Sequence, residues 1–141
     1  MITFRDRVRF GETDCMGVVH HVKYFHWYEM GRVKYLTLAG FDVDWMLHNN
    51  IHFPIVDLQM SYKASCKYDD EYEVQVGITD LNRARMDFIC KIYRVSDGTL
   101  VAEGSSRNLF TDSTGKITRL DAKWYNPLEK MYQEHKEKAG W

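Results

Sequence analysis

The sequence has little of what several large protein classes require. Among its 141 residues there are three cysteines, at positions 15, 66 and 90, and they form neither a CxxC pair nor an even-numbered framework. We therefore expect reduced thiols and a cytoplasmic location, with no disulfides. No apolar run approaches the roughly 18 residues that span a membrane. The first residues lack the apolar stretch of a signal peptide.

Excess positive charge is also missing. The chain has 19 Lys and Arg against 20 Asp and Glu, for a formal net charge of −1. Nucleic acid is therefore not expected as the main ligand, because binding to phosphates needs a basic excess. The composition is 45% hydrophobic and 14% aromatic, which suits a compact core in a chain of this length. We see no repeat or linker and expect a single domain over residues 1–141.

Hydrophobic periodicity predicts an α+β fold. Alternating apolar residues predict strands over 2–10, 55–63, 71–78, 85–95 and 99–112. Gly104 in the last strand indicates a bulge or a close backbone approach. Helical spacing predicts a long helix over 24–39 and shorter ones over 42–49 and 127–138. Asn126 would be the N-cap of the last helix and Pro127 its first residue.

The long helix has a wide apolar arc, so we expect a curved antiparallel sheet to enclose it. Between the first strand and this helix lies the segment with the clearest chemical signal. It runs Phe10-Gly-Glu-Thr-Asp14-Cys-Met-Gly17-Val-Val-His20-His21-Val-Lys-Tyr24. Asp14 would stand beside the first turn of the helix, whose free N–H groups stabilise a polarised or negative oxygen.

A carboxylate in that position could attack an activated carbonyl such as a thioester, or activate a water molecule against it. The N–H groups would hold the oxygen on which negative charge develops. The same local pattern also suits an aspartate that only caps a turn before a glycine. From the local residues alone, both interpretations of Asp14 stay open.

This segment resembles the signature of the 4-hydroxybenzoyl-CoA thioesterase-like branch of the hotdog-fold superfamily, which includes the Tol-Pal-associated short acyl-CoA thioesterases. The positions that match in order and spacing are Glu12-Thr13-Asp14, Gly17, Val18-Val19, His21 and Tyr24. The resemblance implies a hotdog fold, with Asp14 as catalytic carboxylate and His21 assisting. It also implies that the backbone amide of His21 polarises the thioester carbonyl. Phe10 departs from the tyrosine of some members, and His20 from an aromatic residue.

The resemblance implies an acyl-CoA substrate, hydrolysed to a free acid and CoA without a cofactor. The residues expected to bind this substrate are Gly17, Val19, Tyr24, Lys63, Arg83 and Arg85. The basic ones would hold the phosphates of CoA, although each could equally be a solvated surface charge. Hotdog proteins pair their sheets edge to edge, so the resemblance further implies a homodimer or homotetramer with sites between subunits.

Alternatives to this interpretation involve the same residues. His21 could be a surface residue at a helix start, and Cys15 beside Asp14 could be a nucleophile. His20, His26 and Glu29 lack the HExxH spacing, so no metal site is expected. For the whole protein, a non-catalytic acyl-CoA or acyl-carrier binding module and a hotdog dehydratase remain alternatives, and Asp14 favours hydrolysis over both. Acyl chain length and the choice between CoA and acyl-carrier protein stay open.

Overall fold

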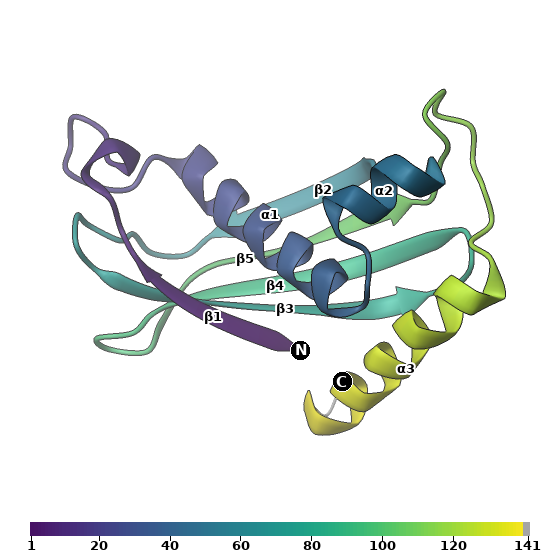
Figure 1. Cartoon of the computed structure of the whole chain (residues 1–141). Helices are drawn as coiled ribbons and strands as arrows, with labels where there is room; N and C mark the ends of the chain where they lie inside the picture. Colours follow the sequence, from purple (N-terminus) through teal and green to yellow (C-terminus); the bar gives the residue numbers. More distant parts are fainter. Residues whose placement is uncertain (140–141) are drawn as a thin grey trace.

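The computed structural model describes residues 1–139, with side chains up to residue 136, and shows a five-stranded sheet curved around a long helix (Figure 1). The strands are β1 (Ile2–Arg7), β2 (Ile55–Tyr62), β3 (Glu71–Leu81), β4 (Arg85–Arg94) and β5 (Thr99–Leu109). Their order in the sheet is β1-β3-β4-β5-β2, and every neighbouring pair is antiparallel. The expected α+β layout is confirmed.

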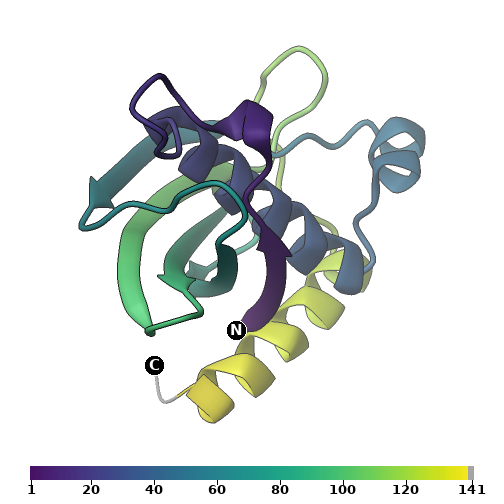
Figure 2. The same ribbon diagram turned by 90° about the vertical axis from the view of Figure 1, so that its left-hand side faces the viewer.

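Helix α1 (His21–Leu38) crosses the concave face of this sheet, and Figure 2 shows the strands curling around it. The α1 residues that are buried recur at helical spacing: Tyr24, Trp27, Tyr28, Gly31, Tyr35 and Leu36. Trp27 stacks on Tyr72 of β3 with ring centroids 3.7 Å apart. At Gly31 the helix comes so close that an added Cβ would stand 2.5 Å from Cγ2 of Val76. The core therefore lies between α1 and the sheet.

The chain turns sooner after the first strand than predicted. β1 ends at Arg7, and a 3-10 turn, η1 (Phe10–Glu12), follows. The carbonyl oxygen of Phe10 accepts hydrogen bonds from both the N–H and the hydroxyl of Thr13, which bends the chain away from the sheet. Phe10, which the prediction placed inside the first strand, is 77% exposed.

Two helix starts also differ from the prediction. Helix α1 begins at His21 instead of Tyr24, because His20 is the N-cap and its ring Nδ1 accepts the Val22 N–H at 3.4 Å. Helix α3 (Ala122–Ala139) begins before Pro127, which lies inside it. The carbonyl oxygen of Asp121 accepts from two N–H groups of the first turn, so Asn126 is not the N-cap. The predicted start of this helix was wrong.

Helix α2 (Val43–Asn49) is confirmed, and its cap Asp42 accepts the Trp45 N–H at 2.8 Å. Helix α3 lies along β3 where β1 no longer covers it, since β1 pairs only with residues 71–76. There the Tyr132 hydroxyl donates to the carbonyl oxygen of Thr79 at 3.1 Å. Within residues 1–139 no helix is both long and apolar enough to cross a membrane.

Strand β2 forms one edge of the sheet and pairs only with β5. Its apolar residues, predicted to share a face, are largely uncovered: Val56 is 54% exposed, Leu58 39% and Tyr62 47%. The close approach expected at Gly104 is confirmed, because an added Cβ would stand 2.6 Å from the carbonyl oxygen of Gln59. The edge of the sheet nearest the start of α1 thus presents an open apolar strand.

Candidate active site

The loop of residues 13–19 projects from the end of the molecule where α1 begins. The Asp14 N–H donates to the carbonyl oxygen of Val18 at 2.9 Å, and the Gly17 N–H donates to that of Asp14 at 3.0 Å. Gly17 has φ 79°, a left-handed conformation that favours glycine. The base of the loop is tied to the strand connection by the Val19 N–H, which donates to the Cys66 carbonyl oxygen at 2.9 Å.

Only one of the two carboxylate oxygens of Asp14 accepts a hydrogen bond within this loop. Its Oδ1 accepts the Met16 N–H at 2.8 Å, as expected of an aspartate that caps a turn. No donor to Oδ2 is found among the described residues, and the side chain is half-buried. Asp14 therefore caps the turn with one oxygen and keeps the other available for chemistry.

The first turn of α1 offers a matching donor. The His20 N–H donates to the carbonyl oxygen of Glu12, and the Lys23 N–H donates to that of His20, each at 2.9 Å. The Val22 N–H is taken by the His20 ring. In the part of the chain that the structure describes, the His21 N–H has no acceptor. An unpaired N–H at the positive end of an 18-residue helix can stabilise a developing oxyanion.

The side chain of His21 is exposed and lies among aromatic rings. It stacks on His20 with centroids 4.5 Å apart and meets the edge of Tyr62 at 6.0 Å. The ring of Tyr62 also lies 5.7 Å from that of Tyr24. Tyr62 was not among the expected site residues. Its place in an alternating strand gave no signal, because only the pairing of β2 brings it to the start of α1.

Two of the expected substrate-binding residues lie in the core. Tyr24 is 3% exposed, and its hydroxyl accepts the Cys66 N–H at 3.1 Å. Burial raises the pKa of Tyr24 to about 12, so this hydroxyl stays protonated under ordinary conditions. Val19 is 4% exposed. Tyr24 and Val19 are therefore buried beneath the loop, whereas Gly17 is exposed near the tip of the loop.

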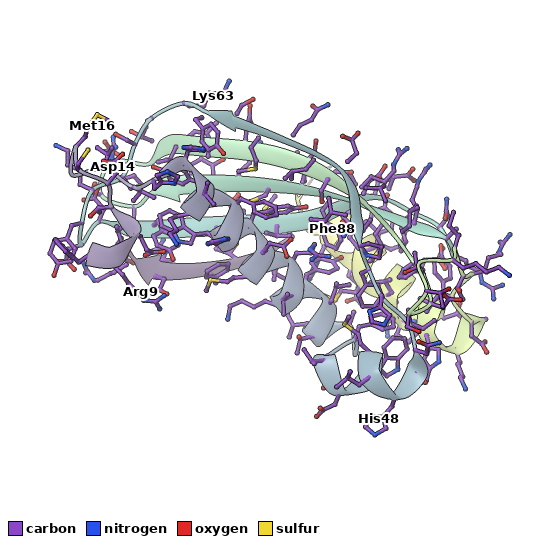
Figure 3. The ribbon with its side chains drawn as sticks, turned by 90° about the horizontal axis from the view of Figure 1, so that it is seen from above. Arg9, Asp14, Met16, His48, Lys63 and Phe88 are labelled. Carbon is purple, nitrogen blue, oxygen red and sulfur yellow. The ribbon has the colours of Figure 1, made fainter. Side chains whose placement is uncertain are left out.

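The three expected phosphate-binding cations fall into two groups. Lys63 follows β2 at the end of the sheet where Asp14 and Met16 lie (Figure 3). Its Nζ is 4.0 Å from the Glu103 carboxylate. Arg83 lies in the turn after β3, and Arg85 begins β4. β3 is an 11-residue strand that leads away from the loop over about 36 Å. One chain by itself therefore does not bring these cations together.

The two arginines also have partners of their own. Nε of Arg83 donates to the carbonyl oxygen of Leu120 at 2.6 Å. Arg85 hydrogen bonds to the Asp80 carboxylate and lies 4.0 Å from that of Asp87. Arg83 keeps its terminal Nη groups for other acceptors, since the side-chain bond found for it among the described residues uses Nε. Arg85 is the more strongly occupied of the two.

Several known proteins are similar to this chain. A sequence model of the thioesterase-like superfamily matches residues 8–130. The acyl-CoA thioester hydrolase YbgC of Escherichia coli O157:H7 is 29% identical over 97 residues, which cover 69% of this chain and 72% of that protein.

Solved structures show the same likeness. The DHNA-CoA thioesterase of Staphylococcus aureus is 28% identical, with a TM-score of 0.85, covering 99% of this chain and 94% of that one. The Thermus thermophilus protein TT1821 is 31% identical, with a TM-score of 0.82, covering 92% of this chain and 98% of that one.

Proposed function

Because the chain belongs to the thioesterase-like superfamily, we propose that it hydrolyses the thioester bond of an acyl-CoA to a free acid and CoA. It has the hotdog fold and is a thioester hydrolase, in line with its named relatives. The observation that best supports the proposal is the pairing of a half-free Asp14 carboxylate with an unpaired His21 N–H at the start of α1.

In the proposed reaction the thioester oxygen accepts a hydrogen bond from the His21 N–H. Oδ2 of Asp14 is the reactive oxygen, because Oδ1 holds the Met16 N–H. As a general base it would take a proton from water while the hydroxide adds to the carbonyl carbon. As a nucleophile it would form a mixed anhydride that water then hydrolyses. In both routes the C–S bond breaks and the CoA sulfur leaves as a thiolate that takes up a proton.

The uncovered edge of the sheet supports a site shared by two chains. A second copy of β2 could pair antiparallel with the first and cover the exposed Val56, Leu58 and Tyr62. Antiparallel pairing reverses the direction of the second sheet. Lys63 of one chain would then face the sheet end that holds Arg83 of the partner subunit, and the two could bind the CoA phosphates together. A homodimer, its doubling to a homotetramer and a cytoplasmic location stay predictions.

Release of free thiol from a panel of acyl-CoAs tests this function, with Asp14→Asn as the decisive variant. An asparagine Oδ1 can still accept the Met16 N–H, so the turn should persist while the reactive carboxylate is lost. We expect kcat to fall by a factor of about 100 or more with binding of the thioester little changed.

The matched control is Asp112→Asn. Asp112 also caps a turn through Oδ1, accepting the Thr114 N–H at 2.9 Å, but in a different loop. The Asp112→Asn variant should therefore keep the kcat of the parent. Full activity of Asp14→Asn would overturn the mechanism. A binding module would take up acyl-CoA without releasing thiol, and a dehydratase would change hydroxyacyl thioesters while leaving the C–S bond intact.

A further inference from the structure

Glu12 holds both ends of the loop that contains Asp14. Its backbone carbonyl oxygen accepts the His20 N–H at 2.9 Å. Its carboxylate accepts two further donors: the Arg9 N–H on Oε1 at 2.8 Å and the Trp27 Nε1–H on Oε2 at 2.7 Å. One half-buried residue thus connects the turn before the loop, the helix start after it and the core beneath it.

The contact with Trp27 joins Glu12 to the buried core of the fold. Trp27 is fully buried on the second turn of α1, and its ring stacks on Tyr72 of β3. A hydrogen bond to a carboxylate is shorter and stronger than one between neutral groups, particularly away from water. Glu12 therefore fixes the start of the loop relative to α1, and its bond from the Arg9 N–H keeps the preceding 3-10 turn closed.

The bonds of Glu12 bear on the distance between the two proposed reactive groups, the Asp14 carboxylate and the His21 N–H. Asp14 lies two residues after Glu12, and His21 directly follows the residue that donates to the Glu12 carbonyl oxygen. We propose that Glu12 is a positioning residue, which holds the Asp14 carboxylate at its working distance from the His21 N–H without touching the substrate. This inference rests on the proposed function. Misplacing a reactive group by about 1 Å can lower the rate by about 100-fold.

Glutamine is a sharp probe of this role because it has nearly the same shape. Its amide offers one acceptor oxygen and one NH2 donor group. Its oxygen can therefore accept from either the Arg9 N–H or the Trp27 Nε1–H. The remaining one of these two N–H groups would then face the NH2 group of the glutamine, which is itself a donor. Glu12→Gln should lower kcat by about tenfold to 100-fold while changing KM by less than about twofold, because the contacts that bind CoA are elsewhere.

Glu73→Gln is the matched control. The Glu73 carboxylate also accepts two donors, from Arg5 at 3.0 Å and Gln75 at 2.8 Å, but on the sheet and without a link to the loop. The Glu73→Gln substitution removes the same charge as Glu12→Gln, but kcat should stay at the parent value. If Glu12→Gln failed to fold, Trp27→Phe would remove the same hydrogen bond from the other side, and its kcat should fall with KM retained.

Amide hydrogen exchange gives a readout that does not depend on activity. In Glu12→Gln, residues 13–20 should exchange faster than in the parent, while β3 and β4 should exchange at the parent rate. Unchanged exchange in the loop would overturn the inference even if the parent had no thioesterase activity. If the parent were active and needed Asp14, but Glu12→Gln had the same kcat as the parent, this inference would be overturned and the proposed function would stand. Inactivity of the parent on every thioester would overturn the proposed function.

Discussion

The N–H of His20 donates to the carbonyl oxygen of Glu12 at 2.9 Å, and this bond closes the loop that contains Asp14. It also satisfies the amide just before α1, whereas the next amide along the chain, that of His21, has no acceptor among the described residues. The backbone and the ring of His21 can be tested separately.

His21→Pro should remove the proposed oxyanion donor without breaking the helix. Proline is well tolerated at the first position of a helix, and His20 already has φ −62° and ψ 133°, which suits a residue before proline. We expect kcat to fall by about 100- to 1,000-fold. Steady-state kinetics and circular dichroism would measure the loss and the helix content.

His21→Ala is the comparison for that variant, since it removes the ring and keeps the N–H. Because the ring is exposed beside Tyr62, we expect a clear but much smaller loss of kcat. Equal losses in the alanine and proline variants would show that the amide is not the donor.

Mixing two defective chains should restore activity if the site is shared. Asp14→Asn lacks the carboxylate that we propose to be reactive, and Arg83→Ala lacks a cation at the far end of the same chain. A hybrid dimer has one site with both residues intact, so random exchange should restore about a quarter of the parent activity at low substrate. The measurement is thiol release before and after subunit exchange. No gain on mixing would contradict a site built from both chains.

Gly104→Ala should destabilise the protein. The added Cβ would stand 2.6 Å from the carbonyl oxygen of Gln59, which is backbone and can move only with β2. Overpacking of this kind lowers the free energy of unfolding by about 1–3 kcal/mol. Gly11→Ala serves as control, because an added Cβ there meets nothing within 4 Å. Thermal unfolding of both variants would measure the difference, and equal midpoints would contradict the close approach of β2 and β5.

The three thiols should react differently with iodoacetamide. Cys15 is exposed, whereas burial raises the pKa of Cys66 to about 11 and that of Cys90 to about 12. At about pH 8 we expect one labelled thiol in the folded protein and three after denaturation, by mass spectrometry. Above about pH 9 the unfolded chain would lose these protons first, so stability should fall as the pH rises. Labelling of Cys66 or Cys90 in the folded protein would contradict their burial.

The sequence by itself determined the local features of this protein. Alternation and helical spacing predicted the strands and α1, because those periods depend on residues close together in the chain. The segment from Phe10 to Tyr24 identified the candidate site for the same reason. The bonds that shape the loop tip join residues within a few positions of one another, such as Asp14 with Met16 and Val18.

Tertiary structure decided what joins distant parts of the chain. The sheet order puts β2 at an edge, so its apolar face lies open and Tyr62 meets His21. It separates Lys63, which follows β2, from Arg83, which follows β3, although the sequence analysis expected both in one site. The bond between Glu12 and Trp27 likewise depends on how η1 meets α1. Local periodicity contains no information on these contacts, because strand pairing and core packing select them among groups that lie far apart in the sequence.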